Sequence, residues 1–124
     1  MDDFSKADME NTLQAIASIT YRSEKAQAKF APGNSQHTLL KNRIKALYIA
    51  SSLIERELSE SDVKENFTKK ELENSLCPIA SLISKSEKTR QKLAEGSWQH
   101  RMFVDNLKAL HIALLLLSKE LNDI

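Results

Sequence analysis

The sequence predicts an all-α protein, an antiparallel four-helix bundle made of two tandem helical hairpins with pseudo-two-fold symmetry. Three observations predict it: a composition that favours helices, an internal repeat over nearly the whole chain, and apolar stripes at helical spacing. The 124 residues are 41% apolar and include only two Gly and two Pro, so turn chemistry is scarce and one core can form. We therefore expect a single domain over residues 1–124.

The internal repeat is the strongest of these observations. When residues 4–60 are laid over residues 67–123 at an ungapped offset of 63, 24 of the 57 aligned positions are identical. The identical runs are Ser23-Glu24-Lys25 over Ser86-Glu87-Lys88, Gln36-His37 over Gln99-His100, and Lys45-Ala46-Leu47 over Lys108-Ala109-Leu110, among shorter matches. One structural unit therefore occurs twice in the chain.

Each repeat contains the start and stop signals of two helices joined by a tight turn. The expected N-caps of the four helices are Ser5, Asn34, Thr68 and Ser97. Glu71 is placed to complete a capping box with Thr68. Pro32-Gly33 and Gly96 are expected to end the first helix of each repeat, with glycine in the left-handed conformation. Pro78, at the position that Ala15 holds in the first repeat, predicts a kink or a break near Cys77.

Apolar residues recur at helical spacing in all four expected helices. In the second helix of each repeat they are Leu40, Ile44, Leu47, Ile54 and Leu58 (with Ser51 in the same stripe), and Phe103, Leu107, Leu110, Leu114, Leu117 and Leu121. In the first helices they are Met9, Leu13, Ile16 and Phe30, and Leu72, Leu76, Ile79, Ile83 and Leu93. Because one hairpin alone would leave its stripe in water, we expect the two repeats to share one core.

The run from Ser23-Glu24-Lys25 through Ser35-Gln36-His37-Thr38-Leu39-Leu40 to Arg43-Ile44-Lys45-Ala46-Leu47 resembles a family of short, uncharacterised bacterial all-helical proteins that carry one such unit, a domain of unknown function. The resemblance covers both repeats, more closely the first. The second repeat departs from it where Arg101-Met102-Phe103-Val104 replaces Thr38-Leu39-Leu40-Lys41. The resemblance implies that single-unit relatives dimerise and that this chain is their fused equivalent; it implies no chemistry.

Charge is unevenly placed, although the net charge is only +1. Residues 21–45 hold six cations against one glutamate, a sum of +5, and residues 84–108 hold six against three acidic residues, a sum of +3. The connector over residues 60–68 reaches at most roughly 30 Å, less than the length of a helix of about 24 residues. We therefore expect both turns and both basic segments at one end of the bundle.

The candidate partner-binding residues at that end are Lys25, Lys29, Lys41, Arg43, Lys45, Lys88, Lys92 and Trp98. The simpler interpretation is an ordinary solvated face, because cations near the C-terminus of a helix oppose its macrodipole. This suits Lys25, Lys29, Lys88 and Lys92 but not Lys41, Arg43 and Lys45, which come early in the second helix. Trp98 replaces Ser35 of the first repeat, and it is either a packing plug or an exposed anchor for a partner.

Two residue pairs lie just after the expected caps: Gln36 with His37, and Gln99 with His100. We expect them to secure the turns; a metal or small-ligand site near His37 and His100 is the alternative, although no Glu-x-x-His pair accompanies them. No metal and no cofactor is predicted. The single Cys77 excludes an intramolecular disulfide and suits a reducing compartment.

No catalytic residue can be assigned, so we expect a non-catalytic protein-interaction or regulatory protein with a protein partner, located in the cytoplasm. No membrane association is expected, because the longest apolar run, residues 112–117, is too short to span a bilayer. The alternative is a nucleic-acid-associated accessory protein that uses the basic turn end, without a recognisable binding motif. Ile112, Leu115 and Leu116 broaden the stripe of the last helix, which is then either the most buried helix or a homodimer face.

Overall fold

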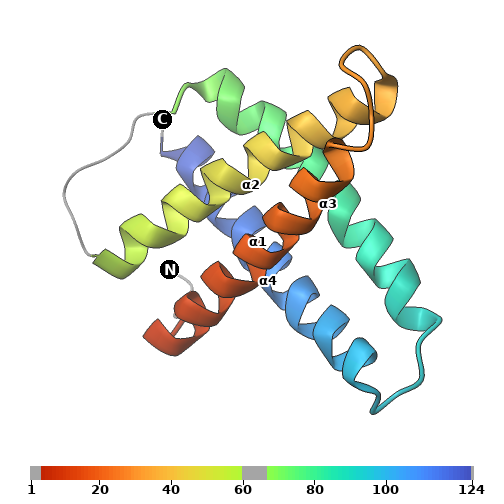
Figure 1. Cartoon of the computed structure of the whole chain (residues 1–124). Helices are drawn as coiled ribbons and strands as arrows, with labels where there is room; N and C mark the ends of the chain where they lie inside the picture. The colour runs from red at the N-terminus through yellow and green to blue at the C-terminus, as the bar shows by residue number, and fades with distance from the viewer. Residues whose placement is uncertain (1–3, 60–66, 124) are drawn as a thin grey trace.

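The computed structural model describes residues 4–59 and 67–123 and folds them into four helices (Figure 1). The helices are α1 (Lys6–Gln27), α2 (Ser35–Ser59), α3 (Lys69–Gln91) and α4 (Trp98–Asn122). α1 pairs with α2 and α3 with α4, so the prediction of an all-α bundle of two hairpins is confirmed. Most of the predicted connector lies outside the described residues. None of the helices in the described ranges is both long and apolar enough to cross a bilayer.

The predicted caps begin all four helices. In each, a side-chain oxygen accepts a backbone N–H of the first turn at 2.8 to 3.1 Å, and the capping residues are Ser5, Asn34, Thr68 and Ser97. Glu71 completes the capping box, because its Oε1 accepts the backbone N–H of Thr68 at 3.0 Å. The sequence therefore fixes where each helix starts.

The helix ends differ from the prediction. Gly33 and Gly96 do take the left-handed conformation, with φ of +92° and +84°. However, α1 already ends at Gln27 and α3 at Gln91, so the glycines shape the turns that follow rather than the helix ends themselves. Phe30 consequently lies beyond α1, and its side chain is 36% exposed, so its placement in the core stripe was wrong.

Of the kink or break predicted near Cys77, the break does not occur, and a kink stays a prediction. α3 continues as one helix from Lys69 to Gln91 with Pro78 inside it. Proline has no N–H to donate to the carbonyl of Asn74, yet the turns on either side keep their own hydrogen bonds and hold the helix together.

The second helices of the two repeats form the centre of the molecule. α2 contacts α4 directly, α1 contacts α4, and α2 contacts α3, whereas α1 and α3 make no contact within the described residues. Side chains with essentially no exposure include the equivalent pairs Ile16 and Ile79, Leu47 and Leu110, and Ile54 and Leu117. Because equivalent residues from both repeats fill one core, the packing has the expected pseudo-two-fold symmetry.

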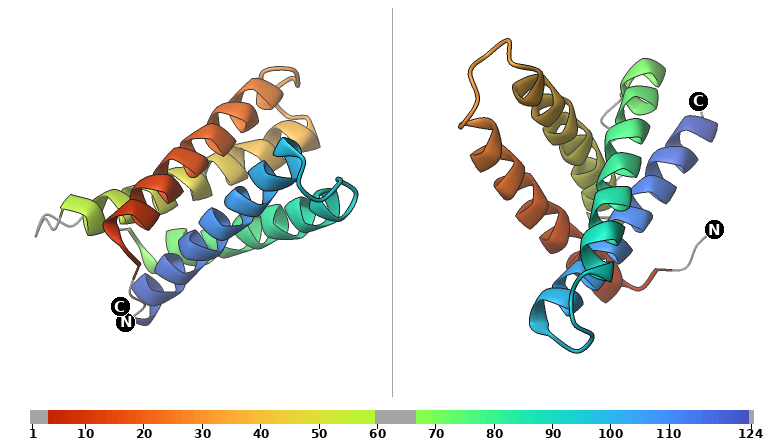
Figure 2. Two further views of the ribbon diagram at one scale, coloured as in Figure 1. Left: turned by 90° about the horizontal axis from the view of Figure 1, so that it is seen from below. Right: turned by 90° about the vertical axis from the view of Figure 1, so that its right-hand side faces the viewer.

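The two hairpins cross rather than lie side by side. In Figure 1 the first hairpin runs from the lower left to the upper right, and the second runs from the upper left to the lower right. Both turns lie on the same side of the molecule, but the right-hand view of Figure 2 shows them at the tips of two separate arms. The single basic pole expected from the sequence is therefore divided between two tips.

Candidate functional site

Two grooves lie between the repeats, one on each side of the central α2–α4 contact. The α1–α4 groove has a volume of about 570 Å³, and the α2–α3 groove has a volume of about 430 Å³. Both fall in the size range of pockets that hold small molecules or single side chains of a partner. Each groove is built from the first helix of one repeat and the second helix of the other, so neither exists in a single hairpin.

The two grooves are equivalent under the internal symmetry. At the offset of 63, ten of the 12 residues that line the α1–α4 groove correspond to residues that line the α2–α3 groove. The pairs are Asp8 and Glu71, Asn11 and Asn74, Thr12 and Ser75, Gln14 and Cys77, Ala15 and Pro78, Met102 and Leu39, Asp105 and Asn42, Asn106 and Arg43, Lys108 and Lys45, and Ala109 and Ala46. Differences in chemistry between the grooves therefore arise from substitutions at matched positions.

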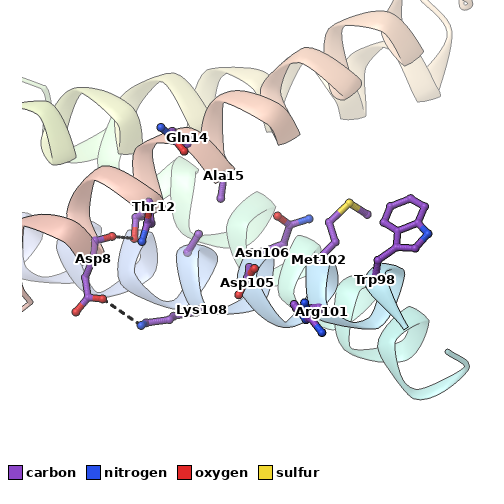
Figure 3. A pocket seen from close by; sticks show the side chains of 12 residues that line it. Asp8, Thr12, Gln14, Ala15, Trp98, Arg101, Met102, Asp105, Asn106 and Lys108 are labelled. Carbon is purple, nitrogen blue, oxygen red and sulfur yellow. Dashed lines mark hydrogen bonds and ion pairs between the residues drawn. The ribbon is translucent and has the colours of Figure 1, made fainter. Parts of the chain in front are cut away.

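The α1–α4 groove has an aromatic and apolar end and a charged end (Figure 3). Trp98 and Met102 lie at one end, and the ion pair of Asp8 with Lys108 lies at the other. Trp98 is 69% exposed, the largest exposed fraction among the exposed large apolar side chains of the described residues. Arg22 of α1 reaches across to Met102, with 3.9 Å between its Nη1 and the sulfur. The charges of the lining residues cancel in this groove, since it contains two acidic residues, Asp8 and Asp105, and two basic residues, Arg101 and Lys108.

The α2–α3 groove carries an excess positive charge, because Arg43 and Lys45 line it against one carboxylate, Glu71. Arg43 is half-buried, and its equivalent Asn106 in the other groove is only 6% exposed, so this position lies on the floor of each groove. Burial lowers the pKa of the Arg43 guanidinium. Lys45 and Glu71 are 4.0 Å apart, and the Lys45 side chain is largely exposed, so their attraction is weak.

An ion pair crosses between the repeats at the same place in each groove. Lys108 Nζ lies 3.2 Å from Asp8 Oδ1, and Lys45 occupies the matching position against Glu71. The hydrogen bond from Lys108 lowers the pKa of Asp8, and the Ser5 hydroxyl adds to the effect. For Glu71 the main cause of a lowered pKa is instead the hydrogen bond from the Thr68 backbone, with Lys45 contributing least. The two cross-repeat pairs are thus equivalent in position and unequal in strength.

The structure separates the residues that the sequence grouped together. Arg43 and Lys45 line the α2–α3 groove, and Trp98 lines the α1–α4 groove. The remaining basic candidates are exposed on the hairpins themselves: Lys25, Lys29, Lys41, Lys88 and Lys92. Lys25 lies over the ring of Tyr21 at 5.2 Å, a cation–π contact.

The residues beside the turns lie in the first turns of α2 and α4. His37 and His100 are both half-buried. The backbone carbonyl of His37 accepts a hydrogen bond from the Gln27 side chain at 3.5 Å. The backbone N–H of His100 donates to the hydroxyl of the cap Ser97. Gln36 donates its backbone N–H to the cap Asn34, and Gln99 is half-buried on α4. The described residues include no group of three His, Cys, Asp or Glu side chains placed to hold a metal ion.

Most of the apolar residues that broaden the stripe of α4 are buried in the core. Ile112 and Leu116 are buried at 2% and 7% exposure and belong to the core, so they are not available as a homodimer face. Only Leu115 of that set is exposed, at 45%. One exposed leucine does not make an apolar patch of the kind that marks an interface.

Sequence reasoning missed most groove residues, including Asn42, Asn74, Ser75, Met102 and Asp105. A signal exists for some of them, the positions at which the two repeats carry different polar residues, such as Asn42 against Asp105 and Arg43 against Asn106. It does not mark Asn74, which is identical to Asn11. No family model, no curated protein and no solved structure matches this chain. The resemblance to a single-unit bacterial family therefore stays a prediction.

Proposed function

We propose that the chain is a non-catalytic protein-interaction protein that holds its partner at the α1–α4 groove. The observation that carries this proposal is Trp98, which is 69% exposed at the rim of that groove beside Met102. An indole held on the first turn of a helix loses little entropy on binding, and tryptophan is strongly enriched among residues that dominate binding energy at interfaces. Methionine beside it supplies a surface that adapts to the shape of an apolar side chain.

The groove also contains the polar groups that an interface needs around an apolar anchor. Arg101 and Asp105 are exposed on α4 one turn apart, and both line the groove next to Trp98 and Met102. A partner segment with one apolar side chain over Trp98 and polar groups toward Arg101 and Asp105 would match this layout. The interaction is expected to be specific, because charged rims fix register more than they add affinity.

The experiment compares the wild type with Trp98→Ser, which installs the residue that the first repeat has at position 35. Tagged protein is used to capture partners from lysate of the source cells, and each captured protein is quantified for both forms. We expect a partner whose affinity falls by roughly thirtyfold or more with Trp98→Ser, corresponding to about 2 kcal/mol. Tyr21→Ser, which removes another exposed aromatic residue from a site away from the groove, is the matched control and should leave capture unchanged.

The proposal is wrong if every partner captured by the wild type is retained by Trp98→Ser, or is lost equally with Tyr21→Ser. Light scattering after size exclusion adds an independent check. A homodimer that Trp98→Ser dissociates would mean that the groove binds a second copy of this chain instead.

A second candidate, a nucleic-acid-associated accessory protein, is favoured by the exposed lysines near the turns. Lys25 and Lys29 near the end of α1 and Lys88 and Lys92 near the end of α3 are all exposed. Because the arms are separated, each tip would contact the phosphate backbone independently (Figure 2). Binding to generic duplex and single-stranded DNA should then weaken steeply with salt, and a flat salt response excludes this candidate.

We also infer that the protein works in a reducing compartment such as the cytoplasm. The thiol of Cys77 is free and exposed, which suits a setting where thiols stay reduced. Imaging of a fluorescent fusion in the source cell tests the location.

A further inference from the structure

We propose that the α2–α3 groove binds a small anionic molecule that carries a carboxylate or phosphate group, and that Arg43 holds the anionic group. This proposal concerns the second groove and does not depend on the protein interaction proposed for the first. It starts from the difference between Arg43 and its equivalent Asn106, which occupy the floors of two otherwise matched grooves.

Arg43 is a half-buried cation without a counter-charge. No carboxylate of the described residues forms an ion pair or hydrogen bond with it, whereas Arg56 and Arg90 in the same molecule each pair with a glutamate. Removing a guanidinium from water without a partner is unfavourable. The same burial lowers the pKa of Arg43, but a guanidinium remains charged under all ordinary conditions. The groove therefore presents a fixed positive charge that an anion would stabilise.

The surroundings of Arg43 suit a compact ligand. Lys45 adds a second positive charge, and the exposed side chains of Asn42 and Asn74 add hydrogen-bonding groups to the lining. Ser75 is buried and donates its hydroxyl to the backbone carbonyl of Glu71. The guanidinium can donate two parallel hydrogen bonds to a carboxylate or phosphate group. Leu39 and Pro78 provide apolar surface for the remainder of the molecule.

The size and charge of the groove favour a small molecule over a polymer. Its volume of about 430 Å³ lies near the lower end of the range for small-molecule pockets. The excess charge of the lining, two cations against Glu71, is one unit, which matches a single anionic group. The α1–α4 groove, the sister groove, lacks this excess positive charge and has Asn106 at its floor. It therefore serves as a negative control for anion binding within the same chain.

The single thiol of the protein provides a reporter, because Cys77 is exposed and lines this groove. The rate of Cys77 alkylation by the uncharged reagent iodoacetamide is measured against rising concentrations of inorganic phosphate and, separately, of succinate, with sodium chloride holding the ionic strength constant. We expect saturable protection by at least one of the two anions. Protection by phosphate alone assigns a phosphate-bearing ligand, protection by succinate alone assigns a carboxylate, and protection by both assigns a site for the shared anionic chemistry.

Three variants make the test specific. Arg43→Asn copies the residue at the equivalent position 106, a change that the same fold accommodates, and should raise the anion concentration needed for protection at least about tenfold. Lys85→Asn removes an exposed cation of α3 that does not line the groove, and it should leave the protection of Cys77 unchanged. Gln14→Cys combined with Cys77→Ser moves the reporter to the equivalent position of the sister groove, where no protection is expected.

Absence of protection by both anions in the wild type overturns the proposal. Protection that is unchanged in Arg43→Asn, or that appears equally at the transferred reporter, overturns it as well. Circular dichroism of each variant establishes that the fold is retained, and Arg43→Lys, which keeps the charge and loses the paired hydrogen bonds, should fall between the wild type and Arg43→Asn.

Discussion

Equivalent core positions of α2 and α4 carry the same or a similar apolar residue, as with Leu47 and Leu110 or Ile54 and Leu117, whereas a groove position a single turn away differs in charge, as with Arg43 and Asn106. The core positions face one another across the symmetric packing and must fit a shared interior, so their shape is constrained. The groove positions face open space between the repeats, so packing constrains their side chains less. The contrast teaches that the repeat fixes the scaffold while each groove has its own chemistry.

The largest expected effect tests whether the two halves share the core equally. Leu47→Ala and Leu110→Ala each remove a fully buried side chain, and each should lower the free energy of unfolding by about 2 to 5 kcal/mol. Urea denaturation of both variants measures the losses. The exposed Leu115→Ala is the control and should change stability by less than about 0.5 kcal/mol. If one of the two core substitutions costs as little as the control, its hairpin does not contribute to a common core.

An intermediate effect on stability is expected at the ion pair between Arg56 of α2 and Glu120 of α4, which has no symmetric equivalent among the ion pairs of the described residues. Arg56 of α2 donates two hydrogen bonds to the carboxylate of Glu120 on α4, one of them from Nη1 at 3.0 Å, and both side chains are mostly buried. Glu120→Gln should lower the free energy of unfolding by about 1 to 3 kcal/mol, because it removes a charge-assisted pair and leaves Arg56 without its main partner.

The control for that change is Glu57→Gln, at the position in α2 that corresponds to Glu120. Glu57 contributes only a longer-range attraction to Arg56, so its loss should cost less. If urea denaturation shows the same loss of unfolding free energy for the two variants, the hydrogen-bonded pairing of Glu120 with Arg56 does not stabilise the fold.

The smallest effect distinguishes the two cross-repeat ion pairs. Lys108→Met should raise the pKa of Asp8, since the hydrogen bond from Lys108 is the main cause of its lowered value. Lys45→Met should raise the pKa of Glu71 less, because the Thr68 backbone is the main cause there. Carboxyl NMR titration of the wild type and both variants measures the shifts.

The same pairs predict a dependence of stability on pH. A carboxylate with a lowered pKa in the folded state contributes stability at pH values above its ordinary pKa, and this contribution is lost as the pH falls through the lowered value. Stability should therefore decline as the solution becomes more acidic than about pH 4. The decline should be shallower for Lys108→Met than for Lys45→Met, and the reverse order would contradict the unequal strengths of the two pairs.

Local signals in the sequence were sufficient to predict the helices and their caps. Ser5, Asn34, Thr68 and Ser97 were identified because capping depends on residues within one turn of each other. The helix does not break at Pro78 for a physical reason: a missing hydrogen bond destabilises a helix without stopping it when tertiary packing holds both sides. Phe30 was misplaced because helical spacing was extended beyond the point where α1 ends.

The grooves could not be predicted from periodicity. Their existence depends on the crossing of two hairpins, and periodicity reports which face of a helix is buried but not the angle at which helices meet. Trp98 was singled out because its counterpart in the first repeat is Ser35, a small polar residue, and Arg43 because it belongs to a basic segment. Their assignment to two different grooves required the packing of α1 on α4 and of α2 on α3.

Covalent fusion of the hairpins has a consequence for stoichiometry. An assembly of two identical single hairpins would have to place the same side chain at both groove floors, so any change that improved one groove would be imposed on the other. In this chain position 43 can be arginine while position 106 is asparagine. If both grooves bind as proposed, one polypeptide would hold two dissimilar molecules at once, in a fixed ratio and at a fixed separation, which a homodimer of the single unit could not do.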